Sequence, residues 1–488
     1  MHGFTPLRIS LAVATAAAVM GTGVAFAGGS SDTAPPARTS EGAAPAAADV
    51  TGATELVDGL IVGYKSQAAE AKSNAAAEKD AAAKAGKAGE PVSFERRLGT
   101  GAALVELPEA DKVQDAQKVA AAFLADPDVA YVVPDRRVHA TAVDPAEYSY
   151  QWDLYETKAG MNVPAAWKQA TGKGVTVAVI DTGITKHTEL SSKLLPGYDF
   201  ISDTWTANDG GGRDNNPSDA GDWVNRGDCG KDENGNPVPA YNTNNSWHGT
   251  HVAGTVAAAA NGHGVVGVAH EANILPVRAL GKCGGTTSDI IDAITWASGG
   301  TVTGVPANKN RAAVINMSLG GEFSCDYAYN AAIEAATDRG TTVVVAAGNE
   351  TDDAANYSPA SCDNVITVAA SDRQGNRADY SNFGTVVDVT APGGETPARS
   401  ADGIWSTINK GTRSLGSEGY ASYQGTSMAT PHVAGLAALL KQKNPSLTPA
   451  QIEQTIKNNT RKLPGSCSGG CGTGLADATK TLSAVTGG

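Results

Sequence analysis

The sequence predicts an α/β protein in which a doubly wound, mostly parallel sheet follows a small α+β domain. Two observations support this prediction. From about residue 140 onward, apolar runs bounded by glycine alternate with helical patterns, and such near-continuous runs are typical of strands buried on both faces. Before residue 140, shorter elements follow one another in a different order. The chain has 488 residues, of which 41% are aliphatic, aromatic or cysteine, so two or three folded units are expected.

The first residues have the pattern of an export signal. Arg8 lies in a weakly positive start, the run Ile9–Met20 is mostly apolar, and Ala25-Phe26-Ala27 places small residues where a signal peptidase cuts. A membrane anchor is the weaker interpretation, because the run is short and no positive stop sequence follows it. We therefore predict that residues 1–27 are a signal peptide and that the protein is secreted to the extracellular space. Residues 28–54, rich in Ala, Pro, Ser and Gly, are predicted to be a disordered spacer.

Residues 55–140 are predicted to be a small domain with its own order of elements. Strands are expected at 60–64, 91–98, 102–107 and 129–133, and helices at 67–87 and 111–124. The resulting order β-α-β-β-α-β is that of a ferredoxin-like sandwich. This order names no chemistry by itself.

Residues 141–488 are predicted to form the larger, doubly wound domain. Its strands are expected in the apolar runs 175–180, 274–277, 314–317, 342–347 and 365–370. Helices are expected between them, such as Tyr327–Arg339, which Gly340 closes, and Thr448–Lys457, which begins with a capping box. In this architecture ligands bind beyond the carboxyl ends of the strands, so polar residues at those ends are the candidates for a site.

The charge balance excludes two classes of partner. Lys and Arg number 37 against 51 Asp and Glu, which gives a formal net charge of −14 and argues against nucleic acid or an anionic membrane surface. After residue 27, no uninterrupted apolar stretch approaches the ~20 residues that a membrane-spanning helix needs.

The six cysteines are an even number and would form three disulfides in an exported protein.

Three polar residues follow apolar strands or begin helices in the large domain. Asp181 ends the run 175–180, His248 begins one apolar helix, and Ser427 begins another. If they meet in one cleft, His248 can activate Ser427 as a general base while Asp181 holds the imidazole tautomer. The unpaired backbone N–H groups beside a serine at a helix start can bind a developing oxyanion.

Taken singly, each of these residues has an ordinary structural explanation, as a turn former, a helix cap or a core residue. The longer strings are more specific. Asp-Thr-Gly from residue 181, His-Gly-Thr-His-Val-Ala-Gly from residue 248 and Gly-Thr-Ser-Met-Ala-Thr-Pro-His-Val-Ala-Gly from residue 425 resemble the three signature blocks of the subtilases. These are the subtilisin-like serine endopeptidases, and the resemblance covers about residues 148–486. It implies a subtilisin-like fold, protein and peptide substrates, no cofactor for catalysis, and a monomer.

Further segments fit the same resemblance. Asn349, after the run 342–347, matches the residue whose amide donates to the oxyanion in subtilases. The segments that resemble the walls of the family's primary specificity pocket are Ser318, Leu319 and Gly320, and Ala346, Ala347 and Gly348. An extended substrate would pair with such backbone edges as an added strand. Glu350 would make the rim of this pocket acidic, and Tyr357 would limit its depth.

An acidic loop at residues 203–222 is the candidate metal site. Its carboxylates lie among glycines and asparagines and would repel one another unless they are solvated or bridged by a hard cation such as Ca²⁺, which takes about 6–8 oxygen ligands. Subtilases commonly bind structural calcium. The predicted ligands are Asp209, Asp214, Asp219 and Asp222, and a solvated acidic loop is the alternative. A second family site near Asn261 is in doubt, because its expected acidic partner is Glu189 rather than an aspartate.

Three other functions are weaker. A zinc hydrolase would need two histidines four residues apart with a glutamate between them, whereas His248 and His251 are three apart, so His251 is simply a helix residue. An α/β-hydrolase esterase would need Gly-x-Ser-x-Gly and the order Ser, Asp, His, but Ala429 replaces the second glycine and the order here is Asp, His, Ser. A catalytically inactive binding protein on the same fold would normally have lost one of the four catalytic residues.

The cysteines allow fifteen pairings, and proximity alone suggests only that Cys467 and Cys471 can close a small loop. Resemblance to secreted subtilases with six similarly placed cysteines implies the disulfides Cys229–Cys283, Cys325–Cys362 and Cys467–Cys471.

Resemblance to subtilase pro-regions implies that residues 28 to about 140 act as an intramolecular chaperone and temporary inhibitor of a zymogen. The segment Asp135–Ala140 would lie extended in the cleft, and the chain would cut itself between about Val138 and Asp144. Residues 28–140 carry 12 Lys or Arg against 17 Asp or Glu, and residues from 141 onward carry 24 against 34. Because both parts are acidic, we expect apolar and main-chain contacts rather than net charge to join them.

Overall fold

The computed structural model describes residues 59–107, 113–135, 137–140, 151–232, 235–261 and 264–486. The predicted signal peptide and spacer lie outside these residues. Within them, the helices are too short or too polar to cross a membrane.

The small domain has the predicted order of elements. Its antiparallel sheet has the strand order β2-β3-β1-β4 and is covered by two main helices. The elements are β1 Gly59–Tyr64, α1 Ala69–Lys72, α2 Asn74–Ala88, β2 Ser93–Arg97, β3 Ala103–Glu106, α3 Val113–Leu124 and β4 Val129–Asp135. The helix predicted at 67–87 is divided at Ser73, whose hydroxyl accepts from Ala76 N and caps α2. The domain has an apolar core of its own, around Leu60, Val105 and Phe123.

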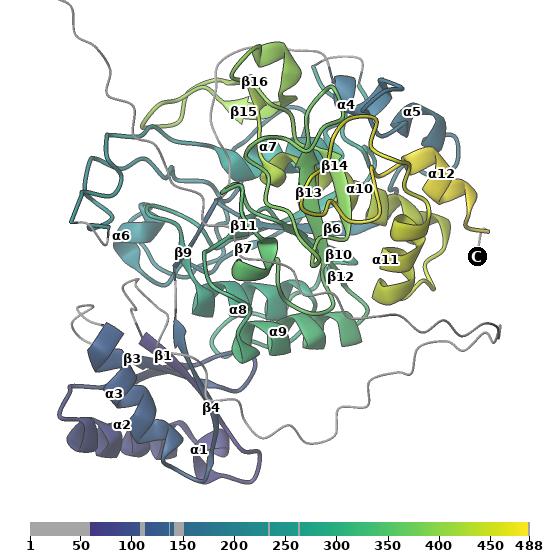
Figure 1. Ribbon diagram of the computed structural model, residues 1–488. Helices are drawn as coiled ribbons and strands as arrows, with labels where there is room; N and C mark the ends of the chain where they lie inside the picture. Colours follow the sequence, from purple (N-terminus) through teal and green to yellow (C-terminus); the bar gives the residue numbers. More distant parts are fainter. Residues whose placement is uncertain are drawn as a thin grey trace, which may run out of the picture. The chain divides into compact units, whose positions relative to one another are not determined.

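The large domain is built on a seven-stranded parallel sheet with the order β14-β13-β12-β10-β6-β8-β7 (Figure 1). The strands are β6 Thr176–Asp181, β7 Tyr198–Asp199, β8 Asn273–Arg278, β10 Val314–Met317, β12 Thr342–Ala346, β13 Ile366–Ser371 and β14 Val389–Pro392. All five strands predicted from apolar runs are present. The edge strands β7 and β14 are additions to the prediction.

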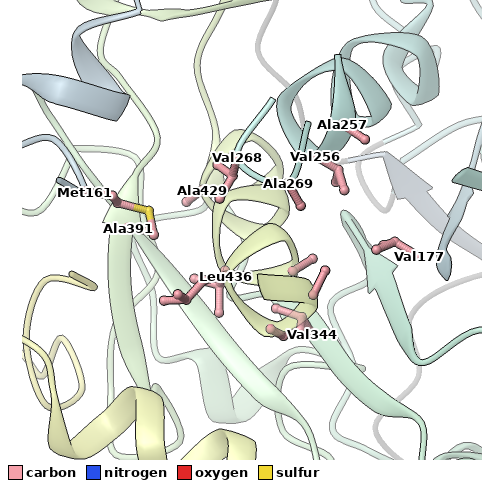
Figure 2. Close-up of a cluster of buried hydrophobic side chains, with 14 of the residues drawn as sticks. Met161, Val177, Val256, Ala257, Val268, Ala269, Val344, Ala391, Ala429 and Leu436 are labelled. Carbon is pink, nitrogen blue, oxygen red and sulfur yellow. The ribbon is translucent and has the colours of Figure 1, made fainter. Parts of the chain in front are cut away.

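Helices cover both faces of this sheet, which makes it doubly wound. On β6, Val177 and Val179 belong to one apolar cluster, whereas Ala178 and Ile180 belong to another, because successive side chains point to opposite faces. The first cluster contains α7 His248–Ala257 and α10 Thr426–Lys443, and Figure 2 shows Leu436 of α10 and Val256 of α7 in it together with Val344. The second contains α8 Thr287–Ala297 and α9 Tyr327–Asp338.

Shorter elements complete the domain. The helices are α4 Trp152–Tyr155, α5 Val163–Ala166, α6 Thr204–Ala207, α11 Pro449–Asn458, α12 Ala478–Ser483, η2 Ala354–Asn356 and η3 Ser400–Asp402. The remaining strands are β5 Arg137–Ala140, β9 Gly285–Thr286, β11 Leu319–Gly320, β15 Ile404–Asn409 and β16 Glu418–Tyr423. The predicted capping box of α11 is present, with Thr448 and Gln451 bonded reciprocally. The structure also contains the three disulfides that the resemblance implied, Cys229–Cys283, Cys325–Cys362 and Cys467–Cys471.

The small domain packs against the helices on one face of the large sheet. Ile61, Leu98, Leu104 and Val133 belong to the same apolar cluster as the side chains of α8 and α9. Beyond β4, strand β5 enters the large domain and pairs antiparallel with both β9 and β11. This strand is the predicted extended segment.

Candidate active site

The predicted catalytic residues all lie at the carboxyl edge of the large sheet. Asp181 is the last residue of β6, Ser318 follows β10, and Asn349 lies three residues after β12. The helices that begin with His248 and Thr426 pack against each other. This is the edge at which parallel α/β sheets bind their ligands.

Asp181 and His248 form a buried hydrogen bond. His248 Nδ1 lies 2.7 Å from Asp181 Oδ1, and neither side chain has solvent exposure. The same carboxylate oxygen accepts from Thr182 N at 2.7 Å. Because Nδ1 donates to a carboxylate, Nε2 is the nitrogen that can accept a proton, and it has no hydrogen-bond partner among the described residues. This tautomer is the one a general base requires.

Ser427 is the second residue of α10 and its hydroxyl is oriented by Ser318. Ser427 Oγ donates to Ser318 O at 3.1 Å, and Ser318 Oγ donates in return to Ser427 O at 2.8 Å. Asn316, in β10, donates through Nδ2 to Ser318 Oγ. In this structure the serine hydroxyl thus donates to a strand-end carbonyl.

The amide of Asn349 is held beside Ser427. Its Oδ1 accepts from Thr426 N at 2.9 Å and from Thr426 Oγ1 at 3.0 Å. Gly348 N in turn donates to Thr426 Oγ1. Because the amide oxygen accepts from the helix start, the orientation of the amide is fixed, and Nδ2 is the donor end of this side chain.

The start of α7 is held by two hydroxyl groups that sequence reasoning missed. The residue preceding the helix, Trp247, has left-handed backbone angles and makes no side-chain cap. Instead, His248 N donates to Ser246 Oγ at 3.2 Å, and Gly249 N donates to Thr182 Oγ1 at 3.0 Å. These hydroxyls occupy the place of an N-cap. The signal in the sequence was a hydroxyl residue within two positions of each triad member.

Each of these hydroxyls donates a hydrogen bond to a carboxylate of the acidic loop. Thr182 Oγ1 donates to Asp219 Oδ2 at 2.7 Å, and Ser246 Oγ donates to Asp222 Oδ2 at 2.6 Å. Burial, and then repulsion from Asp222, raises the pKa of Asp219 to about 7; burial also raises the pKa of Asp222. Two acidic residues predicted to bind calcium therefore accept hydrogen bonds from the hydroxyls that hold the N–H groups of His248 and Gly249.

The four aspartates predicted for calcium do not form one ligand group. Asp209 pairs with Arg278 at 3.0 Å. Asp214 accepts from Asn216 N, and Asp219 and Asp222 are bonded as described above. In the described part of the chain, no three His, Cys, Asp or Glu side chains are arranged to hold a metal ion. Asp209 Oδ1 and Asp214 Oδ2 do face a common space, since each lies 3.7 Å from the position that a Cβ would take on Gly211.

The residues of the doubtful second calcium site contact each other directly. Asn261 Nδ2 donates to Glu189 Oε2 at 2.9 Å, and Tyr420 Oη donates to Glu189 Oε1 at 2.8 Å. Both oxygens of the carboxylate are thus bonded to protein donors. These residues do not fit a cation in this arrangement.

A buried arginine, Arg278, forms ion pairs and hydrogen bonds with several loops next to the site. Arg278, at the end of β8, pairs with Asp199, and its Nε donates to Thr182 O at 3.3 Å. Burial raises the pKa of Asp199 to about 7, against the opposing charge of Arg278. This arginine anchors the segment that follows Asp181, together with the loop that carries Asp209.

The predicted substrate segments border a pair of strand edges. Leu319 and Gly320 form β11, Ala346 ends β12, and Ala347 and Gly348 follow it. The carboxylate of Glu350 accepts from Asn349 N at 2.7 Å and from Asn382 Nδ2 at 2.8 Å, so protein donors hold it.

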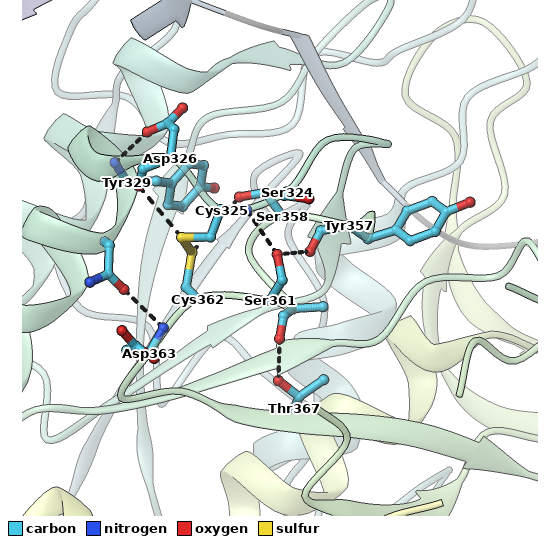
Figure 3. Close-up of a disulfide and its surroundings, with 12 residues drawn as sticks. Ser324, Cys325, Asp326, Tyr329, Tyr357, Ser358, Ser361, Cys362, Asp363 and Thr367 are labelled. Atoms are coloured by element: carbon cyan, nitrogen blue, oxygen red, sulfur yellow. Dashed lines mark hydrogen bonds between the residues drawn. A yellow bond between two sulfur atoms is a disulfide. The ribbon is translucent and has the colours of Figure 1, made fainter. Parts of the chain in front are cut away.

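Tyr357 is buried in a turn next to the Cys325–Cys362 disulfide. In this turn Ser361 Oγ donates to Tyr357 O and accepts from Cys325 N (Figure 3). The turn that carries Tyr357 is therefore cross-linked.

His251 has the structural role that its position on α7 predicted. Its Nε2 donates to Ile404 O and Ala421 O, both at 3.1 Å, and its ring stacks on Tyr423. Burial lowers the pKa of His251 to about 3, so the imidazole is neutral. It takes no part in a metal site.

Comparison with known proteins identifies a family. Residues 172–474 match the Subtilase family, Peptidase_S8. The chain is 52% identical over 406 residues to an extracellular protease of Xanthomonas campestris, covering 83% of this chain and 67% of that protein. It is 42% identical over 409 residues to an extracellular basic protease of Dichelobacter nodosus, covering 82% and 66%. The chain thus spans about two thirds of the length of these relatives. A solved protease from Pseudoalteromonas arctica is 53% identical, with a TM-score of 0.66, and the match covers 68% of this chain and 96% of that one.

Proposed function

The chain belongs to the subtilase family of serine endopeptidases, and we propose that Asp181, His248 and Ser427 are its catalytic triad. The observation that carries this proposal is the buried bond between His248 and Asp181, which leaves Nε2 ready to accept a proton. Ser427 is the second residue of a helix that packs on the helix of His248. An imidazole held in this way acts as a general base for such a hydroxyl.

In the proposed reaction, the Ser427 hydroxyl turns from Ser318 O to His248 Nε2. Oγ attacks the carbonyl carbon of the peptide bond while its proton passes to Nε2. The imidazolium, stabilised by ionised Asp181, then protonates the leaving nitrogen as the C–N bond breaks. A water molecule, deprotonated by His248, hydrolyses the acyl-serine ester and restores the hydroxyl.

We assign the oxyanion contacts to Asn349 Nδ2 and to the backbone N–H of Ser427. The bonds from Thr426 to Asn349 Oδ1 hold the amide in place before the reaction, so no reorganisation is needed when charge develops. In a subtilisin, loss of one such donor costs ~10²–10³ in kcat. No step requires a cofactor.

The same arrangement supports a zymogen that cuts itself. β5 lies between β9 and β11 in the position that an extended substrate would take, with Ala140 opposite Leu319 and Val138 opposite Gly285. β5 runs antiparallel to β11 and so points toward Ser318, whose carbonyl accepts from Ser427. We propose that the bond cut is one of the two that follow Ala140, which is narrower than the range expected from sequence. Residues 28–140 would then remain as a bound inhibitor.

One variant tests both proposals. In a host without other proteases, Ser427→Ala should accumulate as an uncut precursor, whereas the parent chain should yield a mature form that begins at Thr141 or Ala142. A fluorophosphonate should label the parent at Ser427 after maturation. Ser446→Ala, which changes an exposed serine far from the site, should be cut and labelled like the parent. Peptidase activity or processing in the Ser427→Ala protein would refute the mechanism.

Secretion through residues 1–27 and structural calcium complete the proposal. The relatives at 52% and 42% identity are both named as extracellular proteases, which supports export. Calcium, if bound, would be held by Asp209 and Asp214 rather than by all four aspartates. Calcium should then raise the melting temperature of the Ser427→Ala protein by mass action, and Asp214→Asn should reduce that rise. An unchanged melting temperature in excess chelator would exclude the ion.

A further inference from the structure

Arg96 contributes a charged contact where the small domain meets α8. It lies in β2, and its guanidinium reaches two aspartates of α8: Nη2 donates to Asp289 Oδ1 at 3.1 Å and Nη1 donates to Asp292 Oδ2. The side chains of Asp289 and Asp292 are only 2% and 0% exposed. A buried carboxylate is costly unless cations or donors are paired with it.

The large domain supplies only one arginine for these two carboxylates among the described residues. Arg213 Nη1 donates to Asp292 Oδ2 at 2.7 Å, and its Nη2 donates to Asp289 Oδ1. Ser202 donates to Asp289 from both N and Oγ, and Gly99 N of the small domain donates to Asp292 Oδ1. Two guanidinium groups thus balance two buried carboxylates, and one of the two belongs to the small domain.

We propose that Arg96 is the contact that keeps the small domain bound to the large domain after the chain has been cut. The proposal rests on the self-cleavage proposed above. When the small domain leaves, Asp289 and Asp292 lose one guanidinium and the Gly99 donor and keep a surplus negative charge. Both parts of the chain are acidic overall, so this attraction does not come from net charge: it is a local pairing that adds to the apolar and main-chain contacts expected from the sequence.

Apolar contacts at the same interface are independent of Arg96. A Cβ on Gly99 would lie 2.7 Å from Thr295 Cγ2, so this backbone segment rests directly against α8. Leu98 belongs to the apolar cluster of α8 and α9. These contacts place the small domain, whereas Arg96 supplies one of the two guanidinium groups that pair with Asp289 and Asp292. Variants of Arg96 should therefore change how long the cut domain stays bound more than how it docks.

The test uses the complete precursor, refolded from denaturant. The cut is followed on a denaturing gel, and release is followed as the lag between the cut and the appearance of activity on a peptide substrate. Truncating one partner of a buried charge pair mainly speeds dissociation, so Arg96→Ala should shorten the lag ~30-fold or more while the cut proceeds within about twofold of the parent rate. The control, Lys118→Ala, removes an exposed cation that pairs with Glu90 inside the small domain, and should keep the parent lag.

The outcomes separate this inference from the proposed function. If the parent chain is cut and shows a lag before activity appears, and Arg96→Ala shows the same lag, then the proposed role of Arg96 is wrong and self-cleavage still stands. A parent chain that is never cut overturns the proposed function, and the inference falls with it. If Arg96→Ala is not cut, Arg96→Gln, which keeps length and polarity without the charge, decides: an unchanged lag rejects the proposal, and a shortened one supports it.

Discussion

Asp219 is buried and Asp222 is half-buried, and hydroxyl groups link both carboxylates to the proposed triad. Asp219 accepts from Thr182, next to Asp181, and Asp222 accepts from Ser246, two residues before His248. Negative charge at the start of α7 suits the helix dipole and an imidazolium that forms there. The same charges repel each other, which is the cost of placing both in one buried loop.

The raised pKa of Asp219 makes a prediction about stability. Its pKa rises from 3.8 to about 7 on folding, so between these values the folded state holds a proton that the unfolded state releases. The resulting stabilisation is present below about pH 4 and is lost as pH rises through about 7. Asp219→Asn stays neutral at every pH. In a Ser427→Ala background, it should raise the free energy of unfolding at pH 8 by ~1–4 kcal/mol and change it little at pH 4.

Urea denaturation at the two pH values measures this difference. Asp363→Asn, which removes a negative charge from an exposed residue, is the control for net charge. If Asp219→Asn changed the free energy of unfolding by the same amount at pH 8 and at pH 4, the pKa of this carboxyl would not change on folding, and the assignment of a raised pKa would be wrong.

At the scale of elements, the start of α7 couples stability to catalysis. The hydroxyl oxygens of Ser246 and Thr182 accept hydrogen bonds from the first two N–H groups of this helix. We expect both hydroxyls to be needed to hold His248 in a single orientation. Ser246→Ala removes one of them and leaves Asp222 without the hydroxyl donor. It should cost ~0.5–2 kcal/mol of stability, as for a lost helix cap, and lower kcat about tenfold through misplacement of the base.

A second helix provides the comparison. Thr448→Ala removes the cap of α11, where Thr448 and Gln451 are bonded reciprocally far from the triad. We expect a similar loss of stability with kcat unchanged. Measured melting temperatures and steady-state kinetics of the two variants separate capping from positioning. Equal kcat values in the two variants would mean that Ser246 is merely structural.

The elements that could be predicted are those specified by local sequence. Strands β6, β8, β10, β12 and β13 are continuous apolar runs, and a strand buried on both faces leaves that signal wherever it occurs. The two-residue strands β9 and β11 leave no such signal. They exist because β5 pairs between them, which depends on contacts between distant parts of the chain. The residues of the proposed triad could be selected from the sequence because they occur in long, specific strings.

At the scale of the whole molecule, the partners of charged side chains could not be predicted from the sequence. The acidic loop displays its carboxylates in the sequence without the residues that bond to them. In the structure Arg278, Thr182 and Ser246 supply those partners from other elements. In the same way, net charge hid the pairing of Arg96 with Asp289 and Asp292. Pairings between residues far apart in the chain cannot be derived from composition or spacing.

The connectivity of the large sheet leads to the last prediction. β6 pairs with β8 and β10, which lie far along the chain, so much loop entropy must be lost before these contacts form. The strand pairings of the small domain span shorter stretches of chain than these, and the domain has its own core. Its apolar surface packs on α8 and α9, and the strand that follows it, β5, pairs with β9 and β11. In a Ser427→Ala background, which prevents self-digestion, a chain beginning at Thr141 should therefore refold from urea ~10² times or more slower than the whole precursor. Far-ultraviolet circular dichroism follows both reactions, with tryptophan fluorescence as an independent probe. Equal refolding rates in the two chains would mean that the small domain does not assist folding, because a domain that lowers the folding barrier must increase the refolding rate.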